Sequence, residues 1–309
     1  MSSEPKRKSP ADSWKHFKLY SRVKEAIKAL PAHFKTDTFI EGISATDIFT
    51  LNSVLGATIE NQVVATLNQM RPIWDPDEQY MLYSFVRQSQ TFPDVKLMKT
   101  PGTVQQDAEA VLMGIELKGW YLLAKEGEPS FRFVVTPAAC ASQDMIVVVP
   151  WALSNVISGS PRAFAPYIEI ARYAAEYRNY HWQHLREAKS DPRITQPKGV
   201  RPYPTKSDNI ADKPFSDGGS NFGRFARTGI MDQYLAGAKS ETLCGVSAEH
   251  WLNFFKIFQE QTDPGYVLSE IEKLGNHIRA QSTKGSDPSS LDSVNKLLSG
   301  LRELLNRWQ

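Results

Sequence analysis

Two charged residues interrupt an otherwise apolar run, VLMGIELKGW, at positions 111–120. Glu116 and Lys118 are two residues apart, and alternate side chains of an extended strand share one face. Both charges therefore point the same way, while Ile115 and Leu117 point into the opposite packing layer. Because two charges on one face of an apolar strand are costly unless something uses them, the run predicts a strand that carries a functional site.

An acidic residue also stands at the head of an earlier strand-like segment, FPDVKL, at positions 92–97. Pro93 at the first position of a strand loses no ladder hydrogen bond that the strand needs. Asp94 lies 22 residues before Glu116, which gives the pattern PD-x(21)-E-x-K. Over roughly residues 60–151 this pattern resembles the PD-(D/E)xK nuclease superfamily, best known from the type II restriction endonucleases.

The resemblance implies a fold and a chemistry. The fold would be α/β (α+β), with a restriction-endonuclease-like core whose central mixed β-sheet is flanked by helices. Asp94 and Glu116 would bind Mg²⁺ together with the carbonyl of Leu117, because hard divalent cations prefer oxygen ligands. Lys118 would orient or help to deprotonate the attacking water and stabilise charge on the phosphate. The alternative is a surface Glu/Lys pair on an edge strand beside an unrelated aspartate.

Two further acids belong to this hypothesis. The superfamily commonly places a glutamate on the helix before its first core strand, and Glu60 is the only acid between Asp47 and Asp75. By resemblance Glu60 lies at the edge of the metal site, although a carboxylate on the solvated face of a helix is the other interpretation. Asp107 is the substitute ligand if the first strand is out of register.

The first half of the chain predicts two helices and a hairpin. Apolar residues recur at helical spacing from Asp12 to Leu30, and again over 48–70 until Pro72 stops the helix. Residues 77–90 predict another short helix. A turn signal at 126–129 pairs residues 120–124 with residues 131–135 as a hairpin.

The β-branched run at 144–149 predicts a strand buried on both faces and central in the sheet, with Pro150 ending it. The crossover at 137–143 is too short for a substantial helix, so either its helix is a single turn or the topology differs from the superfamily core. A long helix is expected over 166–187. Together these elements give a catalytic core at 41–189.

The charge distribution bounds the partners. Residues 1–40 carry nine Lys and Arg against four Asp and Glu, residues 41–160 carry seven against thirteen, and residues 161–239 carry thirteen against eight. An acidic middle between basic flanks suits a metal centre held between phosphate-binding surfaces, or is ordinary scatter of surface charge. Residues 1–40 are expected to form a basic tail and helix.

Residues 190–309 are expected to form a basic loop segment followed by a C-terminal helical region that serves DNA recognition, dimerisation or both. The loop segment is rich in proline and glycine, and its alternative is an ordinary linker. Arginines flanked by glycine and aromatic residues suit entry into a DNA groove. The expected DNA-binding residues are Arg193, Lys198, Arg201, Arg224 and Arg227.

The C-terminal region predicts a helix with a buried aromatic stripe at Trp251, Phe254, Phe255 and Phe258, and a last helix at 287–308. The leucine seam of that last helix either dimerises or docks on its own domain. Cutting both strands of a palindrome suits twofold symmetry, so a homodimer on double-stranded DNA is expected.

The bulk composition limits the location and the class of the protein. Two cysteines fit a reducing cytosol, no apolar run approaches a membrane span, and the N-terminus lacks the apolar core of a signal peptide, so a cytoplasmic protein is expected. The sequence predicts a Mg²⁺-dependent, sequence-specific DNA endonuclease. A repair or mismatch nicking nuclease and a noncatalytic DNA-binding protein are the alternatives.

Overall fold

The computed structural model describes residues 3–44, 47–88, 91–99, 110–187, 191–259, 264–282 and 298–300. A six-stranded sheet forms its centre, in the order β1-β2-β3-β4-β5 with β6 also paired to β4. The strands of this sheet are β1 (Tyr83–Arg87), β2 (Val95–Lys99), β3 (Val111–Tyr121), β4 (Met145–Leu153), β5 (Pro161–Ala163) and β6 (Tyr167–Ile170).

The sheet is mixed. Strands β1, β2 and β3 form an antiparallel series, β3 and β4 are parallel, and β5 and β6 both run antiparallel to β4. Every residue of β4 is buried, and the strand is paired at both edges, with β3 on one side and with β5 and β6 on the other. The central, fully buried strand predicted from the β-branched run is therefore confirmed, as is a mixed α/β architecture.

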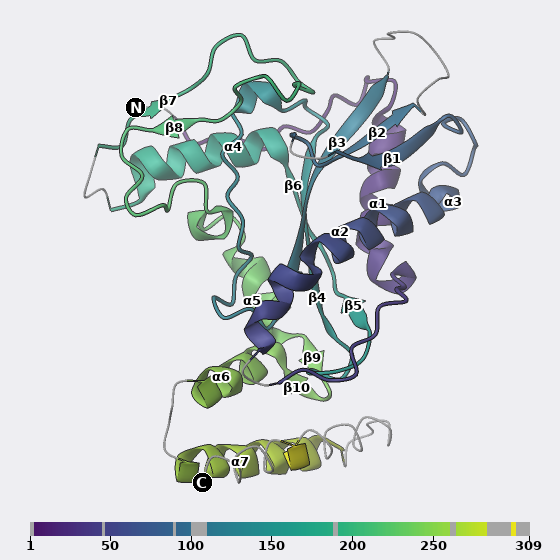
Figure 1. Ribbon diagram of the computed structural model, residues 1–309. Coiled ribbons are helices and arrows are strands. Elements are labelled where there is room, and N and C mark those ends of the chain that lie inside the picture. Colours follow the sequence, from purple (N-terminus) through teal and green to yellow (C-terminus); the bar gives the residue numbers. More distant parts are fainter. Residues whose placement is uncertain are drawn as a thin grey trace.

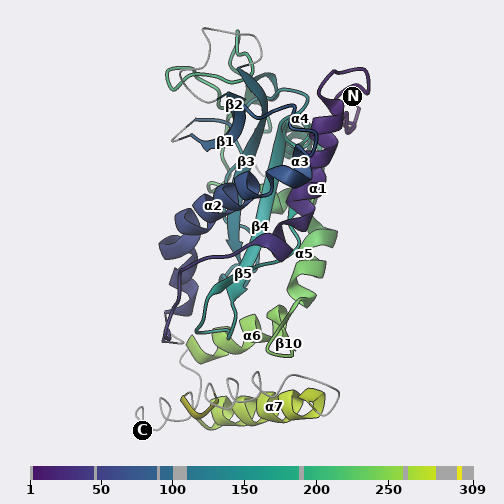
Figure 2. The same cartoon turned by 90° about the vertical axis from the view of Figure 1, so that its right-hand side faces the viewer.

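Helices flank the sheet on both sides (Figures 1 and 2). Helix α2 packs against β1 and β3, while α4 packs against β4 and β6. Figure 1 shows α1 and α3 to the right of the long strands and α4 to their left. The helices are α1 (Phe17–His33), α2 (Leu51–Gln69), α3 (Arg71–Trp74), α4 (Ala171–Tyr180), α5 (Asp232–Ser240), α6 (Ala248–Gln259) and α7 (Pro264–Ser282).

Shorter elements connect these layers. They are the 3-10 helices η1 (Ile48–Thr50), η2 (Pro137–Ala139) and η4 (Phe225–Thr228), the π-helical turn η3 (His181–Leu185), and the two-stranded sheets β7 (Ile194–Thr195) with β8 (Lys213–Pro214) and β9 (Thr242–Leu243) with β10 (Val246–Ser247). Within the described ranges, no helix combines the length and the apolar character that crossing a membrane requires.

Two of the predicted helices are partly strands. Residues 83–87, placed in a helix at 77–90, form β1, in which Tyr83 and Phe85 are buried and alternate with more exposed residues. Residues 167–170, placed in a helix at 166–187, form β6, and α4 begins only at Ala171. Both segments are short, and pairing with another strand, β2 for β1 and β4 for β6, decides their conformation.

The predicted hairpin between 120–124 and 131–135 is wrong. Residues 115–121 of β3 pair in parallel with β4 instead. The backbone of the 131–135 segment bonds to a later part of the chain, for example from the N–H of Phe133 to the carbonyl of Gly223 at 2.7 Å and from the N–H of Asp212 to the carbonyl of Val134 at 2.8 Å. The loop segment after residue 190 therefore packs against the core.

Pro150 does not end its strand, because β4 continues to Leu153. β6 pairs with β4 up to Val148 and β5 pairs with it from Trp151, so Pro150 falls between the two partners, where no ladder donor is needed. The crossover between β3 and β4 contains only η2, which matches the expected single helical turn.

The described part of the C-terminal region is helical, as predicted. Trp251, Phe254 and Phe255 of α6 are buried, while the side chain of Phe258 lies outside the described residues. Most of the last helix expected at 287–308 also lies outside them. Leu298, which lies within them, is buried.

Candidate active site

The edge of β3 is open beyond the end of β2. The pairing between the two strands stops at Val95 and Ile115, whereas β3 runs on to Tyr121. Alternate residues of a strand direct their N–H groups to the same edge, and three such groups follow on this edge. Side chains accept them: Asp94 Oδ2 from Leu117 at 3.1 Å, Glu60 Oε1 from Gly119 at 3.3 Å and Asn52 Oδ1 from Tyr121 at 3.2 Å.

Asp94 and Glu116 meet at the first of these positions. Besides accepting the Leu117 N–H, Asp94 donates its own backbone N–H to Glu116 Oε2 at 3.3 Å. Two carboxylates that are 22 residues apart in the sequence therefore lie side by side where β2 leaves β3. Both residues are partly buried.

Gly114 allows this close approach. A Cβ atom on Gly114 would lie 2.2 Å from Cγ of Pro93 and 2.9 Å from Oδ1 of Asp144. The glycine lets the Pro93 ring rest on β3, which places Asp94 against Glu116. Its N–H donates to Asp144 Oδ1 at 2.8 Å.

Asp144 directly precedes β4 and fixes the start of that strand against β3. Its carboxylate also accepts the N–H of Ala141 at 2.7 Å and the hydroxyl of Tyr203 at 3.1 Å. Because the side chain is fully buried, desolvation raises the pKa of Asp144 to about 6, against the opposing effect of these hydrogen bonds. We assign it a structural role at the junction of β3 and β4.

The electrostatics of the pair indicate a missing positive charge. Burial raises the pKa of Asp94 to about 6, and the charge of Glu60 adds to this, although the Leu117 N–H opposes it. The pKa of Glu116 is raised well above its usual value, first by burial and then by the charge of Asp94. Lys118 offsets these effects at both acids, and Arg87 does so at Asp94, but only in part, so a further cation beside the pair would lower both pKa values.

Glu60 lies next to Lys118. Its Oε1 is 3.5 Å from Lys118 Nζ, and its Oε2 accepts a hydrogen bond from Arg87 Nη2 at 2.6 Å. Arg87 is held in turn by Asn61 Oδ1 at 2.6 Å. The contacts of Glu60 are therefore to cations and to the Gly119 N–H, which suits orienting Lys118.

Arg87 is absent from the residues that the sequence singled out. It lies at the last position of β1, the strand that sequence reasoning assigned to a helix, so no strand face could be assigned to it. Alternation of Tyr83, Phe85 and Arg87 on a strand next to the Asp94 segment was the signal that could have found it.

The donor set fits a hard divalent cation in its chemistry. Two carboxylates with raised pKa values adjoin, and the carbonyl of Leu117 faces the same open edge as its N–H, because both groups of a strand residue lie on one side. Among the residues that the structure describes, no three or more His, Cys, Asp or Glu side chains form a metal-binding group. The predicted set contains two carboxylates and a backbone oxygen. Asp107 lies outside the described residues.

The structure thus brings together Glu60, Asp94, Glu116 and Lys118, and it does not gather the five predicted DNA-binding residues beside them. Arg193 lies next to the β7–β8 pair, where its Nε is 2.8 Å from Asp191 Oδ2 and its guanidinium covers the Phe215 ring. Lys198 and Arg201 are exposed in the loop before β8. Arg224 directly precedes η4, and Arg227 lies within it.

Comparisons of this chain with protein-family models, with curated proteins and with solved structures found no match.

Proposed function

We propose that this protein is a Mg²⁺-dependent deoxyribonuclease that cuts double-stranded DNA at a specific sequence, with a PD-(D/E)xK core similar to that of the type II restriction endonucleases. One observation carries the proposal. Asp94 and Glu116 adjoin at the open edge of β3 with raised pKa values, and Lys118 lies on the same strand two residues beyond Glu116. Acids and an ammonium group in this order suit metal-assisted hydrolysis of a phosphate ester.

The carboxylates Asp94 and Glu116, with the carbonyl of Leu117, would hold the ion. Bound there, Mg²⁺ would supply a Lewis acid for the phosphate and a water of lowered pKa. The main-chain contacts of Asp94 fix its carboxylate relative to β3, so the two acids are already placed before the ion binds.

Lys118 acts on the attacking water and on the phosphate. Its ammonium group can donate a hydrogen bond that orients the water, and its charge opposes the charge that grows on the phosphate oxygens. Glu60 Oε1 lies 3.5 Å from Nζ and directs that group along the edge of β3. Arg87 holds Glu60 from behind, which makes Arg87 and Glu60 positioning residues.

The arrangement of the sheet supports the resemblance to this superfamily. A mixed sheet with helices on both sides, and a parallel β3–β4 pair at its centre, has the architecture that the resemblance implies. The single turn η2 in place of a crossover helix is a departure from that pattern. A homodimer would place two such sites on the two strands of a palindrome, and the cytoplasm is the location that we propose.

Plasmid cleavage tests the proposal. Wild-type protein is incubated with supercoiled plasmid in Mg²⁺, in Ca²⁺ and in EDTA, beside the variants Glu116→Gln and Asp94→Asn. Glu249→Gln, an exposed acid on α6, is the matched control. We expect cleavage only in Mg²⁺, defined ends on sequencing, and loss of cleavage in the two site variants with DNA binding in Ca²⁺ retained.

Other outcomes would favour one of the alternative functions or refute the assignment of the site. Nicked circles without linear product would indicate the nicking nuclease. DNA binding without cleavage by the wild type would indicate the noncatalytic DNA-binding protein. Cleavage by Glu116→Gln at the wild-type rate would refute the assignment of the site.

A further inference from the structure

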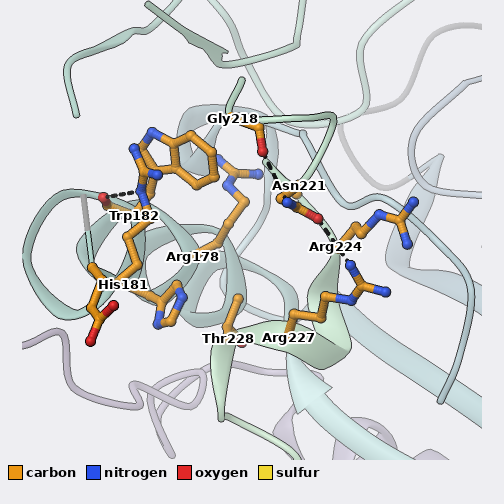
Figure 3. Close-up of a pocket in the computed structure, with 11 residues that line it drawn as sticks. Arg178, His181, Trp182, Gly218, Asn221, Arg224, Arg227 and Thr228 are labelled. Carbon is orange, nitrogen blue, oxygen red and sulfur yellow. Dashed lines mark hydrogen bonds between the residues drawn. The ribbon is translucent and has the colours of Figure 1, made fainter. Parts of the chain in front are cut away.

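A second site with the opposite charge lies on another part of the molecule. A pocket of about 360 Å³ opens between the C-terminal end of α4 with η3 and the segment 218–228. Figure 3 shows Trp182 and His181 on one side of it and Arg227 on the other. Four arginines line the pocket, and Glu187 is the one acid among its described lining residues.

Two of the four arginines are neutralised by partners within the protein. Arg178 is buried, and its guanidinium pairs with Asp212 and donates to the carbonyl of Phe133 at 2.7 Å. Arg227 pairs through Nε with Glu128 Oε1 at 2.7 Å. These two residues shape the pocket and have little charge left for a ligand.

The other two arginines have only carbonyl partners among the described residues. Arg186 donates from Nε to the carbonyl of Trp182 at 2.9 Å, and its guanidinium carbon lies 3.5 Å from the centre of the Trp182 ring. Its Nη2 is buried and has no hydrogen-bond acceptor in the described structure. Arg224 donates from Nε to the carbonyl of Ser220 at 3.3 Å.

A buried guanidinium nitrogen without an acceptor is unfavourable, because the group loses its water and gains nothing in exchange. Arg186 Nη1, by contrast, lies beside Gly218 in the pocket lining, where an anion would accept a hydrogen bond from it. The forked guanidinium matches phosphate oxygens in geometry. A cavity of about 360 Å³ with an indole at its wall is larger than a bare phosphate needs, and it falls in the range of small organic ligands.

We propose that this pocket binds a phosphate ester of nucleotide size, with the phosphate held by Arg186 on the Trp182 side and the organic group extending toward Arg224 on the opposite side. Burial, with the charge of Arg186, lowers the pKa of His181, so its imidazole is neutral near pH 7 and offers one donor and one acceptor to the ligand. The ligand is either a free nucleotide or one nucleotide unit of a nucleic-acid strand. This site is separate from the carboxylates and stands without the proposed nuclease activity.

The test is a titration of the full-length protein with dAMP in EDTA, followed by isothermal calorimetry and by tryptophan fluorescence. Arg186→Gln and Arg224→Gln should each weaken dAMP binding about tenfold or more, since each removes a charge-assisted hydrogen bond. Arg193→Gln, which removes the same charge outside the pocket, should bind as the wild type does. Trp182→Phe should remove the fluorescence change that accompanies binding.

Deoxyadenosine is the matched ligand without phosphate, and it should bind at least tenfold more weakly than dAMP. Competition by an unlabelled single strand would identify a strand as the source of the ligand, and failure to compete would identify the free nucleotide. The proposal is overturned if wild-type protein binds no dAMP, or if both arginine variants, with wild-type melting temperatures, bind it as the wild type does. Neither result bears on plasmid cleavage, because the titration contains no Mg²⁺ and no substrate DNA.

Discussion

The carboxylate site and the arginine pocket are opposite in charge and in construction. In the first, two acids adjoin with their pKa values raised, and in the second, two guanidinium groups have no acid partner among the described residues. Phe133 lies between them: its ring contacts Phe92, two residues before Asp94, and the Arg178 guanidinium covers it. Each region lacks the charge that its ligand would bring.

Their construction also differs. The carboxylates are held by the backbone of one strand and by a helix beside it. The pocket depends on side chains from α4, η3 and a segment some forty residues later, joined mainly by side-chain packing. Regular backbone spacing builds the first site, whereas contacts between distant segments build the second.

The largest expected effect separates the two sites by function. Lys118→Met should slow plasmid cleavage by about 10²–10⁴-fold, because the ammonium group that orients the water is lost. It should leave dAMP binding unchanged. Arg186→Gln should weaken dAMP binding and leave the cleavage rate unchanged if the ligand is a free nucleotide. Single-turnover cleavage rates and calorimetric titrations of both variants measure this, and an intact cleavage rate in Lys118→Met would remove it from the site.

The next effect concerns the buried acid that anchors β4. Asp144 has a folded-state pKa of about 6 against 3.8 when unfolded, so the folded protein holds a proton that the unfolded chain has released. The free energy of unfolding should therefore fall as the pH rises from about 4 to about 6, by up to about 3 kcal/mol.

Asp144→Asn removes this dependence, because the amide does not ionise. Urea denaturation of wild type and variant across pH 4 to 7 measures it, and Glu25→Gln, an exposed acid on α1, is the control. Parallel pH profiles for wild type and Asp144→Asn would mean that this carboxylate does not limit stability.

A smaller effect is expected at Glu60. Glu60→Gln should lower the cleavage rate about tenfold and raise the Mg²⁺ requirement, because Lys118 loses its charged neighbour and the site loses one negative charge. Arg87→Gln should reproduce part of the loss in rate through Glu60. A Mg²⁺ titration of each variant checks this, with melting temperatures as the control, and an unchanged titration in Glu60→Gln would assign that acid to the helix surface.

The smallest effect is expected at Arg227. Because Glu128 already pairs with it at the exposed rim, Arg227→Gln should weaken dAMP binding by no more than about threefold, against about tenfold for Arg224→Gln. DNA affinity in Ca²⁺ over a salt series also tests both residues. In a variant that no longer touches a DNA phosphate, the slope of log affinity against log salt concentration should be shallower by about one. Equal losses of dAMP affinity for the two residues would mean that Glu128 does not neutralise Arg227.

The sequence was sufficient where structure follows local spacing. The alternation of Glu116 and Lys118 identified a strand with two charges on one face, and the apolar stripe on 48–70 placed Glu60 on a helix. The continuous β-branched run identified the central strand. These features depend on residues within one element, so a single sequence contains them.

It was insufficient where the conformation of a segment depends on partners outside that segment. Strands β1 and β6 are short segments whose conformation depends on pairing with β2 and β4. Residues 131–135 were assigned to a hairpin because a turn precedes them, but residues 210–225 take their backbone groups. Arg186 looked like one of several arginines on a helix, and its missing acceptor becomes visible only when Trp182 and Gly218 surround it.

The open edge of β3 has a consequence for how this protein can change. Its backbone donors at Leu117, Gly119 and Tyr121 recur every two residues, so they stand about 7 Å apart. The backbone spacing of β3 therefore fixes the distances between the points at which Asp94, Glu60 and Asn52 bond to the strand, whatever the lengths of the loops on either side. Insertions in those loops should leave the spacing intact. One residue inserted in β3 would change which backbone donors face this edge, and it would turn the two charges to the other face.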